Sequence, residues 1–360
     1  MTGAWTSISP GDINVGQRAS DGFPPEPTIA FAAAKNPSGA VLGIFPRFRP
    51  SYVQQFNLTI EHEITPWQVL LKAGYVGNLG RRLDTTLNLN QPIPGPTSTA
   101  SRRPYFGVRP NLSDVTFAVS DGLSNYNAAQ LTVEKRLSHG LGMLLGYAWG
   151  HIIDDTGNTY GGGTGTPQDP RNRRADRGNA SFDVRHRMTI SYLYNLPFGK
   201  GRTYLNRGGP ANLLLGGWQT NGIATLQSGL PFTPQLQTST TNCCSSRPNR
   251  IANGTLPSGQ RSIARWFDTT AFITPPPFTY GSAGRDILFG PGRVNFDMSL
   301  FKDFPIREEL KLQFRAEAFN IFNTPQFGQP NASIGNVQAP VISSTVGNPR
   351  QLQMALRFQF

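Results

Sequence analysis

The carboxy-terminal segment Arg350–Phe360 alternates polar and apolar residues without a break. In an extended strand, one face then carries Leu352, Met354, Leu356, Phe358 and Phe360, and the other carries Gln351, Gln353, Arg357 and Gln359. A strand that is apolar on one side and polar on the other suits a wall between lipid and a watery lumen. A half-buried strand of a soluble sandwich gives the same alternation, so the rest of the chain has to decide.

The composition favours an all-β fold. The 360 residues include 39 glycines and 30 prolines, and only 38% are hydrophobic, so turns and loops take a large share of the chain. The most apolar stretch, Leu141–Ile153, contains Gly142, Gly146 and Gly150. It is shorter than the ~20 residues that a membrane-spanning helix needs.

Period-two segments recur along the chain, and most are longer than the five or six residues usual in soluble sheets. Their lengths are close to the ~9–11 residues of tilted membrane strands. The predicted strands are Tyr52–Ile64, Trp67–Gly77, Tyr126–Arg136, Leu141–Ile153, Arg185–Leu196, Leu214–Leu226, Asn295–Phe304, Glu309–Phe319 and Arg350–Phe360.

The connectors between these segments alternate between shorter and longer. The shorter set is Thr65–Pro66, Leu137–Gly140, Pro197–Leu213 and Pro305–Glu308, and the longer set is Asn78–Asn125, Asp154–Val184, Gln227–Val294 and Asn320–Pro349. Outer-membrane barrels have short periplasmic turns and long external loops, whereas loops of this length are uncommon in compact domains. We therefore predict a transmembrane antiparallel β-barrel in the outer membrane of a Gram-negative bacterium, with Phe360 on the periplasmic side.

The number of predicted strands is odd, whereas single-chain bacterial barrels have an even number. Thr28–Phe45 is a weak candidate for a tenth strand, and the start of the sequence lacks the basic and apolar regions of a secretory signal. We therefore expect a fragment of a larger barrel. Residues 1–49 would be an external lead-in with at most one strand, and residues 50–360 the carboxy-terminal part of the barrel.

Several motifs are specific enough to indicate a family. They are Ser124–Leu137 followed by Gly146–Asp155, Asp183–Arg187 followed by Leu196–Gly199, Gly216–Trp218 with Gln227–Phe232, Arg315–Asn323, and Tyr75–Gly77 followed by Asn90–Pro92. In their order and spacing the chain resembles TonB-dependent outer-membrane receptors, in particular the Oar-like type of acidobacteria, over roughly residues 50 to 360.

The resemblance implies a barrel of about 22 strands filled by an amino-terminal plug and energised through TonB. The plug, the TonB box and the carboxypeptidase-regulatory-like sandwich domain of such receptors are not recognisable here, so TonB would act only through a part missing from this sequence. The implied function of the full-length form is energised uptake or binding of a ligand. Two alternatives remain open: a structural or adhesive barrel without transport, and a secreted β-rich carbohydrate-binding protein.

Lys311, Arg315 and Glu317 fall on the polar face of their predicted strand, and we expect them to face the lumen. A charge on the lipid face near the midplane costs ~2–4 kcal/mol, whereas a lumenal charge stays hydrated. The three side chains would line a substrate path and pair along or across strands. The alternative is that they only solvate the wall.

Two further sets of residues are typical of a membrane barrel. Tyr147 with Trp149, and Tyr192 with Tyr194, each share a strand face near a strand end, as in an aromatic girdle, although cross-strand packing is the alternative. Leu356, Phe358 and Phe360 are a candidate carboxy-terminal signal for the barrel-assembly machinery.

The loop Asp169–Arg177 concentrates charge in a chain of net charge +12. Such an arginine cluster can bind lipopolysaccharide phosphates or an anionic ligand, or it is simply a solvated loop. The basic residues are spread over many segments, which argues against a nucleic-acid interface.

No motif indicates catalysis, a cofactor or a metal site. The histidines His62, His139, His151 and His186 are scattered, and His186 is expected to form hydrogen bonds at the barrel rim. Cys243 and Cys244 are the only cysteines, so they can form a vicinal disulfide but not a disulfide framework or a Cys-x-x-Cys metal site.

Overall fold

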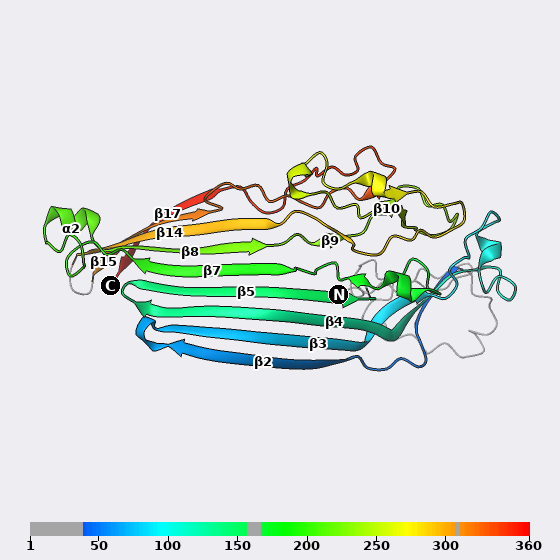
Figure 1. Cartoon of the computed structure of the whole chain (residues 1–360), viewed down its shortest axis with the longest axis horizontal. Helices are drawn as coiled ribbons and strands as arrows, with labels where there is room; N and C mark the ends of the chain where they lie inside the picture. The colour runs from blue at the N-terminus through cyan, green and yellow to red at the C-terminus, as the bar shows by residue number, and fades with distance from the viewer. Residues whose placement is uncertain (1–38, 157–166, 307–309) are drawn as a thin grey trace, which may run out of the picture.

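The computed structural model describes residues 39–156, 167–306 and 310–360, and in them nine long strands form one antiparallel sheet (Figure 1). Each strand pairs with the next one along the chain. The strands are β2 (Tyr52–Ile64), β3 (Val69–Asn88), β4 (Leu112–Ser138), β5 (Leu141–Asp154), β7 (His186–Asn195), β8 (Trp218–Gln227), β14 (Arg293–Pro305), β15 (Lys311–Phe319) and β17 (Gln351–Gln359).

All nine predicted strands are present, and the main differences lie at their ends. About half of the predicted loop Asn78–Asn125 is strand, because β3 and β4 stay paired out to Asn88 and Thr116, with register shifts around Leu83. Leu214 belongs not to β8 but to the short helix α2 (Pro210–Leu215). Proline at its first position favours a helix start, because the missing N–H has no intrahelical partner there anyway.

The weak tenth-strand candidate does not extend the row of barrel strands. Its described part forms β1 (Gly39–Ile44), which pairs in parallel with the far end of β4, where Val41 lies opposite Val115. A barrel strand would pair antiparallel with a neighbouring strand, so this prediction was wrong for residues 39–44. Residues 28–38 lie outside the described part of the chain.

The remaining elements are short. Strands of two residues are β6 (Gly178–Asn179), β9 (Pro231–Phe232), β10 (Gln235–Leu236), β11 (Asn249–Arg250), β12 (Phe272–Ile273), β13 (Leu288–Phe289) and β16 (Ser333–Ile334). Single 3-10 turns are Thr65–Trp67, Ala100–Arg102, Arg173–Asp176, Ser258–Gln260 and Thr269–Ala271. Among the described residues, no helix is both long and apolar enough to cross a membrane.

The register separates apolar from polar residues across the sheet. Tyr147 lies opposite Met188, which lies opposite Leu226, which in turn lies opposite Val294. One position away, Thr189 lies opposite both Gly146 and Thr225. Successive side chains of a strand point to opposite faces, so the first row belongs to an apolar face and the second to a polar face.

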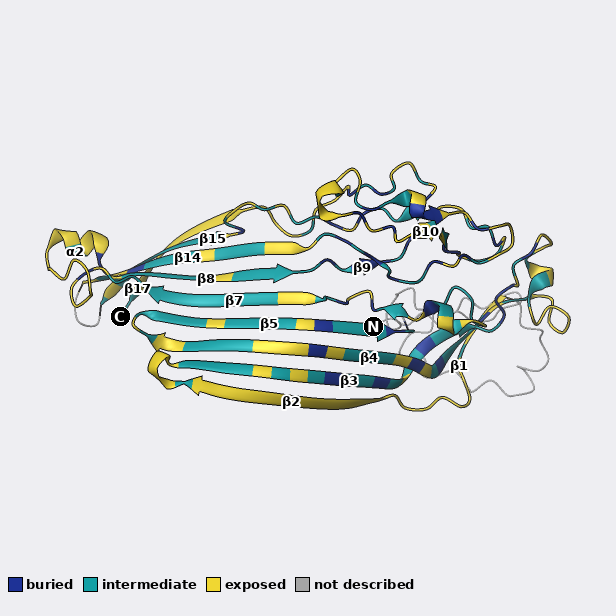
Figure 2. Cartoon of the chain, viewed as in Figure 1, coloured by how far each residue is buried: buried dark blue, intermediate teal, exposed yellow. Residues whose placement is uncertain are grey.

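Among the described residues, no protein layer covers the apolar face of β17. On β17, the side chains of Leu352, Met354 and Leu356 are 68%, 74% and 67% exposed. Exposed apolar patches of this extent mark contact with a partner or with lipid. Figure 2 accordingly shows exposed and half-buried residues along the strands, with buried residues concentrated toward the loop end.

The hydrophobic core lies in the long loops rather than on the sheet. Phe232, Phe267, Phe272, Leu288 and Ile334 form a buried cluster drawn from the segments after β8 and after β15. Trp266 packs against it, and its indole Nε1 donates to the carbonyl of Phe289 at 2.8 Å. The external loops of the prediction therefore fold together into a cap, at the end of the sheet opposite α2 (Figure 1).

The sheet is open at both edges. In the described part of the chain, β2 pairs only with β3 and β17 pairs only with β15. Antiparallel strands of this length in a single meander are the wall of a barrel, and here nine of them form an arc of it.

Candidate functional site

The three predicted charged residues of β15 lie on the polar face. Arg315 is opposite Phe301, Glu317 is opposite Ser299, and Lys311 is opposite Pro305. The neighbouring residues Phe314 and Ala316 lie on the apolar face, opposite Leu356 and Met354 of β17. The alternation therefore assigns Lys311, Arg315 and Glu317 to the expected face, and their lining of a lumen stays a prediction.

These charged side chains make other contacts than those expected. The Arg315 guanidinium lies 5.0 Å from the centre of the Phe301 ring, and its Nε donates to Gln313 Oε1 at 2.6 Å. Gln313 in turn donates to Asp303 Oδ1 at 2.8 Å. Among the described residues, no ion pair joins Lys311, Arg315 and Glu317 to one another, so the charges of Lys311 and Glu317 stay available on the polar face.

A cavity of about 430 Å³ lies farther along the same face, at the cap end of the sheet. It is lined from β8, β14, the start of β17 and the segment after β15; among its residues are Thr225, Gln227, Arg293, Asn295, Asp297, Asn320, Gln326, Asn348 and Gln351. Sequence reasoning did not single out this cavity, because its walls come from segments that are far apart in the chain.

Part of this lining is fixed by internal hydrogen bonds. Asp297 Oδ1 accepts from Asn295 Nδ2 at 3.0 Å and from the backbone N–H of Asn320 at 2.8 Å. Gln326 exchanges hydrogen bonds with Val294, accepting from its N–H at 3.1 Å and donating to its carbonyl at 2.5 Å. These bonds tie the segment after β15 to the end of β14 and shape the cavity.

Other lining groups keep their hydrogen-bonding capacity. In the described residues, the side chains of Gln227, Arg293 and Gln351 have no protein partner. One guanidinium and two amides supply several donors and two acceptor oxygens. Such a set suits a polar ligand with hydroxyl or anionic oxygens. No group of three potential metal-ligating side chains occurs among the described residues.

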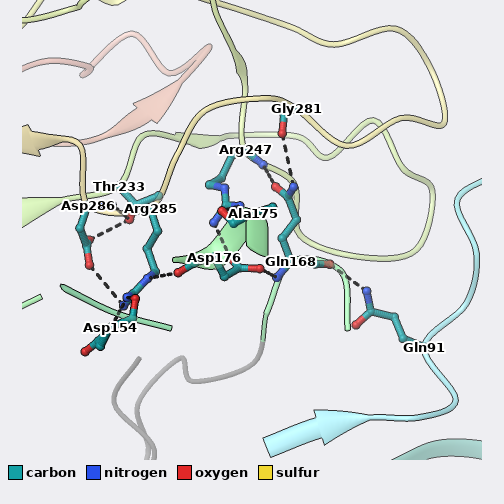
Figure 3. Close-up of polar contacts among 10 residues, drawn as sticks. All are labelled: Gln91, Asp154, Gln168, Ala175, Asp176, Thr233, Arg247, Gly281, Arg285 and Asp286. Atoms are coloured by element: carbon teal, nitrogen blue, oxygen red, sulfur yellow. Dashed lines mark hydrogen bonds and ion pairs between the residues drawn. The ribbon is translucent and has the colours of Figure 1, made fainter. Parts of the chain in front are cut away.

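The cap is joined to the sheet by a buried polar network (Figure 3). Arg247 Nη1 lies 2.6 Å from Asp176 Oδ1, and each side chain is only 8% exposed. Arg247 also donates from Nη2 to the Ala175 carbonyl at 3.0 Å, and its backbone N–H donates to Gln168 Oε1 at 2.7 Å. The Asp176–Arg247 pair thereby joins the segment after β5 to the segment after β8.

A second part of the network lies beside the first. Arg285 donates from Nε to the Asp176 carbonyl at 2.8 Å and forms an ion pair with Asp154 at the end of β5 (Figure 3). The next residue, Asp286, accepts from Thr233 Oγ1 at 2.8 Å. Burial raises the pKa of the Asp286 carboxyl above its ordinary value, against the opposing effects of the Thr233 hydrogen bond and the Arg285 charge.

The four girdle candidates all lie on the apolar face. The Tyr147 hydroxyl is 2.8 Å from His186 Nδ1, and the Trp149 ring is stacked on His186 with ring centres 6.3 Å apart. The prediction that His186 forms hydrogen bonds is therefore confirmed. Tyr192 and Tyr194 lie toward the other end of the sheet, opposite Met143 and Leu141. Their placement at membrane interfaces stays a prediction.

The carboxy-terminal signal candidates lie on the apolar face of the edge strand β17 and beyond its end. Leu356 is 67%, Phe358 61% and Phe360 100% exposed. The role of these residues in recognition by the assembly machinery stays a prediction. Cys243 and Cys244 are joined by a disulfide in the cap.

Residues 3–353 match the family described as "Outer membrane beta barrel domain". Similar solved structures include the outer membrane transporter YddB from Escherichia coli, with 9% identity and a TM-score of 0.48 over 89% of this chain and 34% of that one. BauA, the ferric preacinetobactin receptor from Acinetobacter baumannii, has 11% identity and a TM-score of 0.43 over 86% of this chain and 29% of that one.

Fiu, the ferric-catecholate import receptor of E. coli K12, has 12% identity and a TM-score of 0.42 over 87% of this chain and 28% of that one. This chain thus spans about a third or less of the length of these three proteins. No curated protein matches the sequence.

Proposed function

We propose that this chain, which belongs to the outer membrane β-barrel domain family, forms part of the wall and the external cap of a larger ligand-translocating barrel. The family indicates the cell outer membrane as its location. More finely, we propose a TonB-dependent receptor of the Oar-like type. That proposal is supported by the motifs in residues 50 to 360, and the function is energised uptake of a polar ligand.

The observation that carries the proposal is the two-faced, open sheet with a polar cavity at its cap end. Each backbone group left unpaired in a bilayer costs several kcal/mol, so the free edges of β2 and β17 need further strands beside them. A wall that needs more strands than this chain has belongs to a wide barrel. Wide barrels hold a lumen large enough for a ligand path.

The proposed path begins at the cavity with Arg293 and continues down the polar face past Arg315 and Glu317. Arg293 and Gln227 face each other across β14 and β8, so both can hold one ligand at the cap end. Arg315 and Glu317 on β15 then keep the wall hydrated along the strand. A polar ligand would meet hydrogen-bonding groups at both levels.

The proposed partners follow from this placement. They are outer-membrane lipid and lipopolysaccharide around the apolar face, the barrel-assembly machinery at the carboxy-terminal strand, and TonB through an amino-terminal part outside this sequence. No nucleic acid and no cofactor enters the proposal.

Uptake by cells tests the proposal. Spent medium from cells that produce the full-length protein would be compared, by mass spectrometry, with medium from cells that lack the gene and from cells that lack TonB. We expect at least one compound to be depleted only when both the protein and TonB are present. Depletion that persists without TonB, or no depletion in any strain, would contradict energised uptake and favour a structural barrel.

A substitution connects the uptake to the cavity. Arg293→Gln is expected to slow depletion of that compound, because Arg293 is the one arginine among the described residues that line the cavity. The matched control is Arg207→Gln, which removes an exposed arginine in the turn at the opposite end of the sheet. Equal effects of the two substitutions would show that the cavity does not hold the ligand.

A further inference from the structure

We infer that the outer rim of the sheet carries a binding pocket for the phosphate group of an outer-leaflet glycolipid. The pocket is a cavity of about 450 Å³ on β3 and β4, level with the cap end of β5, where Asn125 lies opposite Ile153. Four arginines line it together with Leu123, Asn125 and the carboxylate of Asp155; they are Arg81, Arg173, Arg174 and Arg177. The inference rests on the proposed function only for placing the apolar face in lipid.

The floor of the pocket belongs to the apolar face. Arg81 lies opposite Tyr52 on one side and Leu123 on the other, and Leu79 lies opposite Asn125. Side chains two residues apart in a strand lie on the same face, so Leu79 and Arg81 of β3 lie on the same face as Tyr75. The pocket is therefore on the side of the sheet that would meet lipid, opposite the side of the proposed ligand cavity.

Aromatic residues lie on the same face, between the pocket and the middle of the sheet. Phe56 and Tyr75 are 46% and 42% exposed, and their ring centres are 6.1 Å apart. Arg82, next to Arg81, lies 5.4 Å from the centre of the exposed Tyr52 ring. Aromatic side chains at this level are typical of the membrane–water interface, where lipid headgroups lie. The pocket thus lies at headgroup level.

The charges of the pocket leave a cationic site. Arg173 forms ion pairs with Asp121 and, at 3.6 Å, with Asp155, so the nearby carboxylates already have a partner. In the part of the chain that the structure describes, Arg81, Arg174 and Arg177 form no ion pair. Three guanidinium groups without a carboxylate partner therefore line one cavity.

The geometry of Arg81 is set by the protein. Its Nη1 donates to the carbonyl of Ser124 at 3.4 Å and to Asn125 Oδ1 at 3.1 Å, which holds the guanidinium over β4. Arg174 and Arg177 are exposed on and beside the 3-10 turn Arg173–Asp176. Guanidinium groups bind phosphate oxygens in bidentate fashion, so a fixed arginine with two free ones nearby suits a phosphate monoester.

The proposed ligand is a lipid, because the cationic pocket is continuous with the apolar face of the sheet. A phosphorylated glycolipid places its phosphate at headgroup level and its acyl chains along the wall below. A free phosphate ion would use the arginines but not the wall.

Lipid binding to the purified full-length protein tests the inference. Native mass spectrometry would measure retention of diphosphorylated lipid A and of the same lipid after removal of both phosphates, with and without inorganic phosphate as competitor. The variant is Arg174→Gln with Arg177→Gln. Its matched control is Arg202→Gln with Arg207→Gln, two exposed arginines at the opposite end of the sheet.

We expect the Arg174/Arg177 variant to retain diphosphorylated lipid A about tenfold more weakly than the unchanged protein, which corresponds to ~1.4 kcal/mol. The control should retain it unchanged. Both variants should keep the heat-modifiable gel migration of a folded barrel, since all four side chains are exposed. A second variant, Arg81→Lys, keeps the charge but loses the fork geometry and should also weaken retention.

Three results would overturn the inference. The first is equal retention of the phosphorylated and dephosphorylated lipids. The second is an equal loss of lipid retention in the Arg174/Arg177 variant and in the Arg202/Arg207 control, and the third is displacement of the lipid by inorganic phosphate at equal concentration. The last result would assign the site to free phosphate. Loss of TonB-dependent uptake in an Arg293 variant with unchanged lipid retention would leave the two proposals independent.

Discussion

Replacing Asp176 by asparagine should loosen the cap while leaving the barrel wall intact. Asparagine has nearly the shape of aspartate and still offers an oxygen to the backbone N–H of Gln168, which Asp176 Oδ2 now accepts at 3.1 Å. The substitution therefore removes mainly the charge that faces Arg247. Arg247 would remain 6% exposed, with its Nε lacking a hydrogen-bond partner in the described structure.

The expected magnitude follows from this burial. Removing one partner of a buried ion pair costs about 3–5 kcal/mol, because an uncompensated charge is left away from water. Since each 1.4 kcal/mol is a factor of ten, local opening of the cap should become roughly 10²- to 10⁴-fold more frequent. Arg171→Gln is the matched control in the same loop. It breaks the more exposed pair with Asp169, at 2.9 Å, for which less than about 1 kcal/mol is expected.

Hydrogen exchange of the full-length protein in nanodiscs measures these openings. Peptides covering residues 167–177 and 244–250 should exchange far faster in the Asp176→Asn protein than in the Arg171→Gln protein. Peptides from β5 and β7 should be unchanged in both. If Asp176→Asn exchanged like the Arg171 control, the buried pair would not hold the cap, and the reasoning from burial would be refuted.

Three further predictions concern pH, the lipid face and assembly. Burial raises the folded-state pKa of Asp286, so the folded cap binds that proton more tightly than the unfolded chain. The stability that this group contributes is therefore present below its ordinary pKa of 3.8, and it is lost as the pH rises through the raised folded-state pKa. Asp286→Asn should flatten the pH dependence of cap proteolysis over that range. Ala316→Arg, on the apolar face, should cost ~2–4 kcal/mol and reduce the folded fraction on a heat-modifiability gel, whereas Glu317→Arg beside it should not. Equal effects at the two positions would contradict the assignment of faces. Phe360→Ala should lower the amount of protein assembled in the outer membrane without changing the melting temperature of what is assembled, because Phe360 is fully exposed; a lowered melting temperature would indicate a packing role instead.

The strands could be predicted from the sequence because a two-faced wall must alternate at every second residue. Arg350–Phe360 and Leu141–Ile153 follow that rule, and β17 and β5 lie where the pattern indicates. The pattern is weaker in the outer halves of β3 and β4, where the buried residues include polar Thr85 as well as apolar Val119. These segments, beyond Gly77 and before Tyr126, were expected to be loop, although they are paired strand.

The cap and its polar network could not be predicted in this way. Asp176 and Arg247 lie 71 residues apart, and no periodicity links them. The same holds for Arg81 and the arginines after β5, which meet only because β3, β4 and β5 are neighbours in the sheet. Sequence reasoning found the charged loop Asp169–Arg177 but could not separate its paired arginines from its unpaired ones.

The central claim is that one face of the sheet meets lipid and the other meets water. Spin labels placed one at a time from position 311 to 319, in the full-length protein in bilayers, test it through their collisions with oxygen and with a water-soluble nickel complex. Labels at 312, 314, 316 and 318, on the apolar face, should collide more often with oxygen. Labels at 311, 313, 315 and 317, on the polar face, should collide more often with the nickel complex. Accessibility without a period of two, or with the two faces exchanged, would contradict the account.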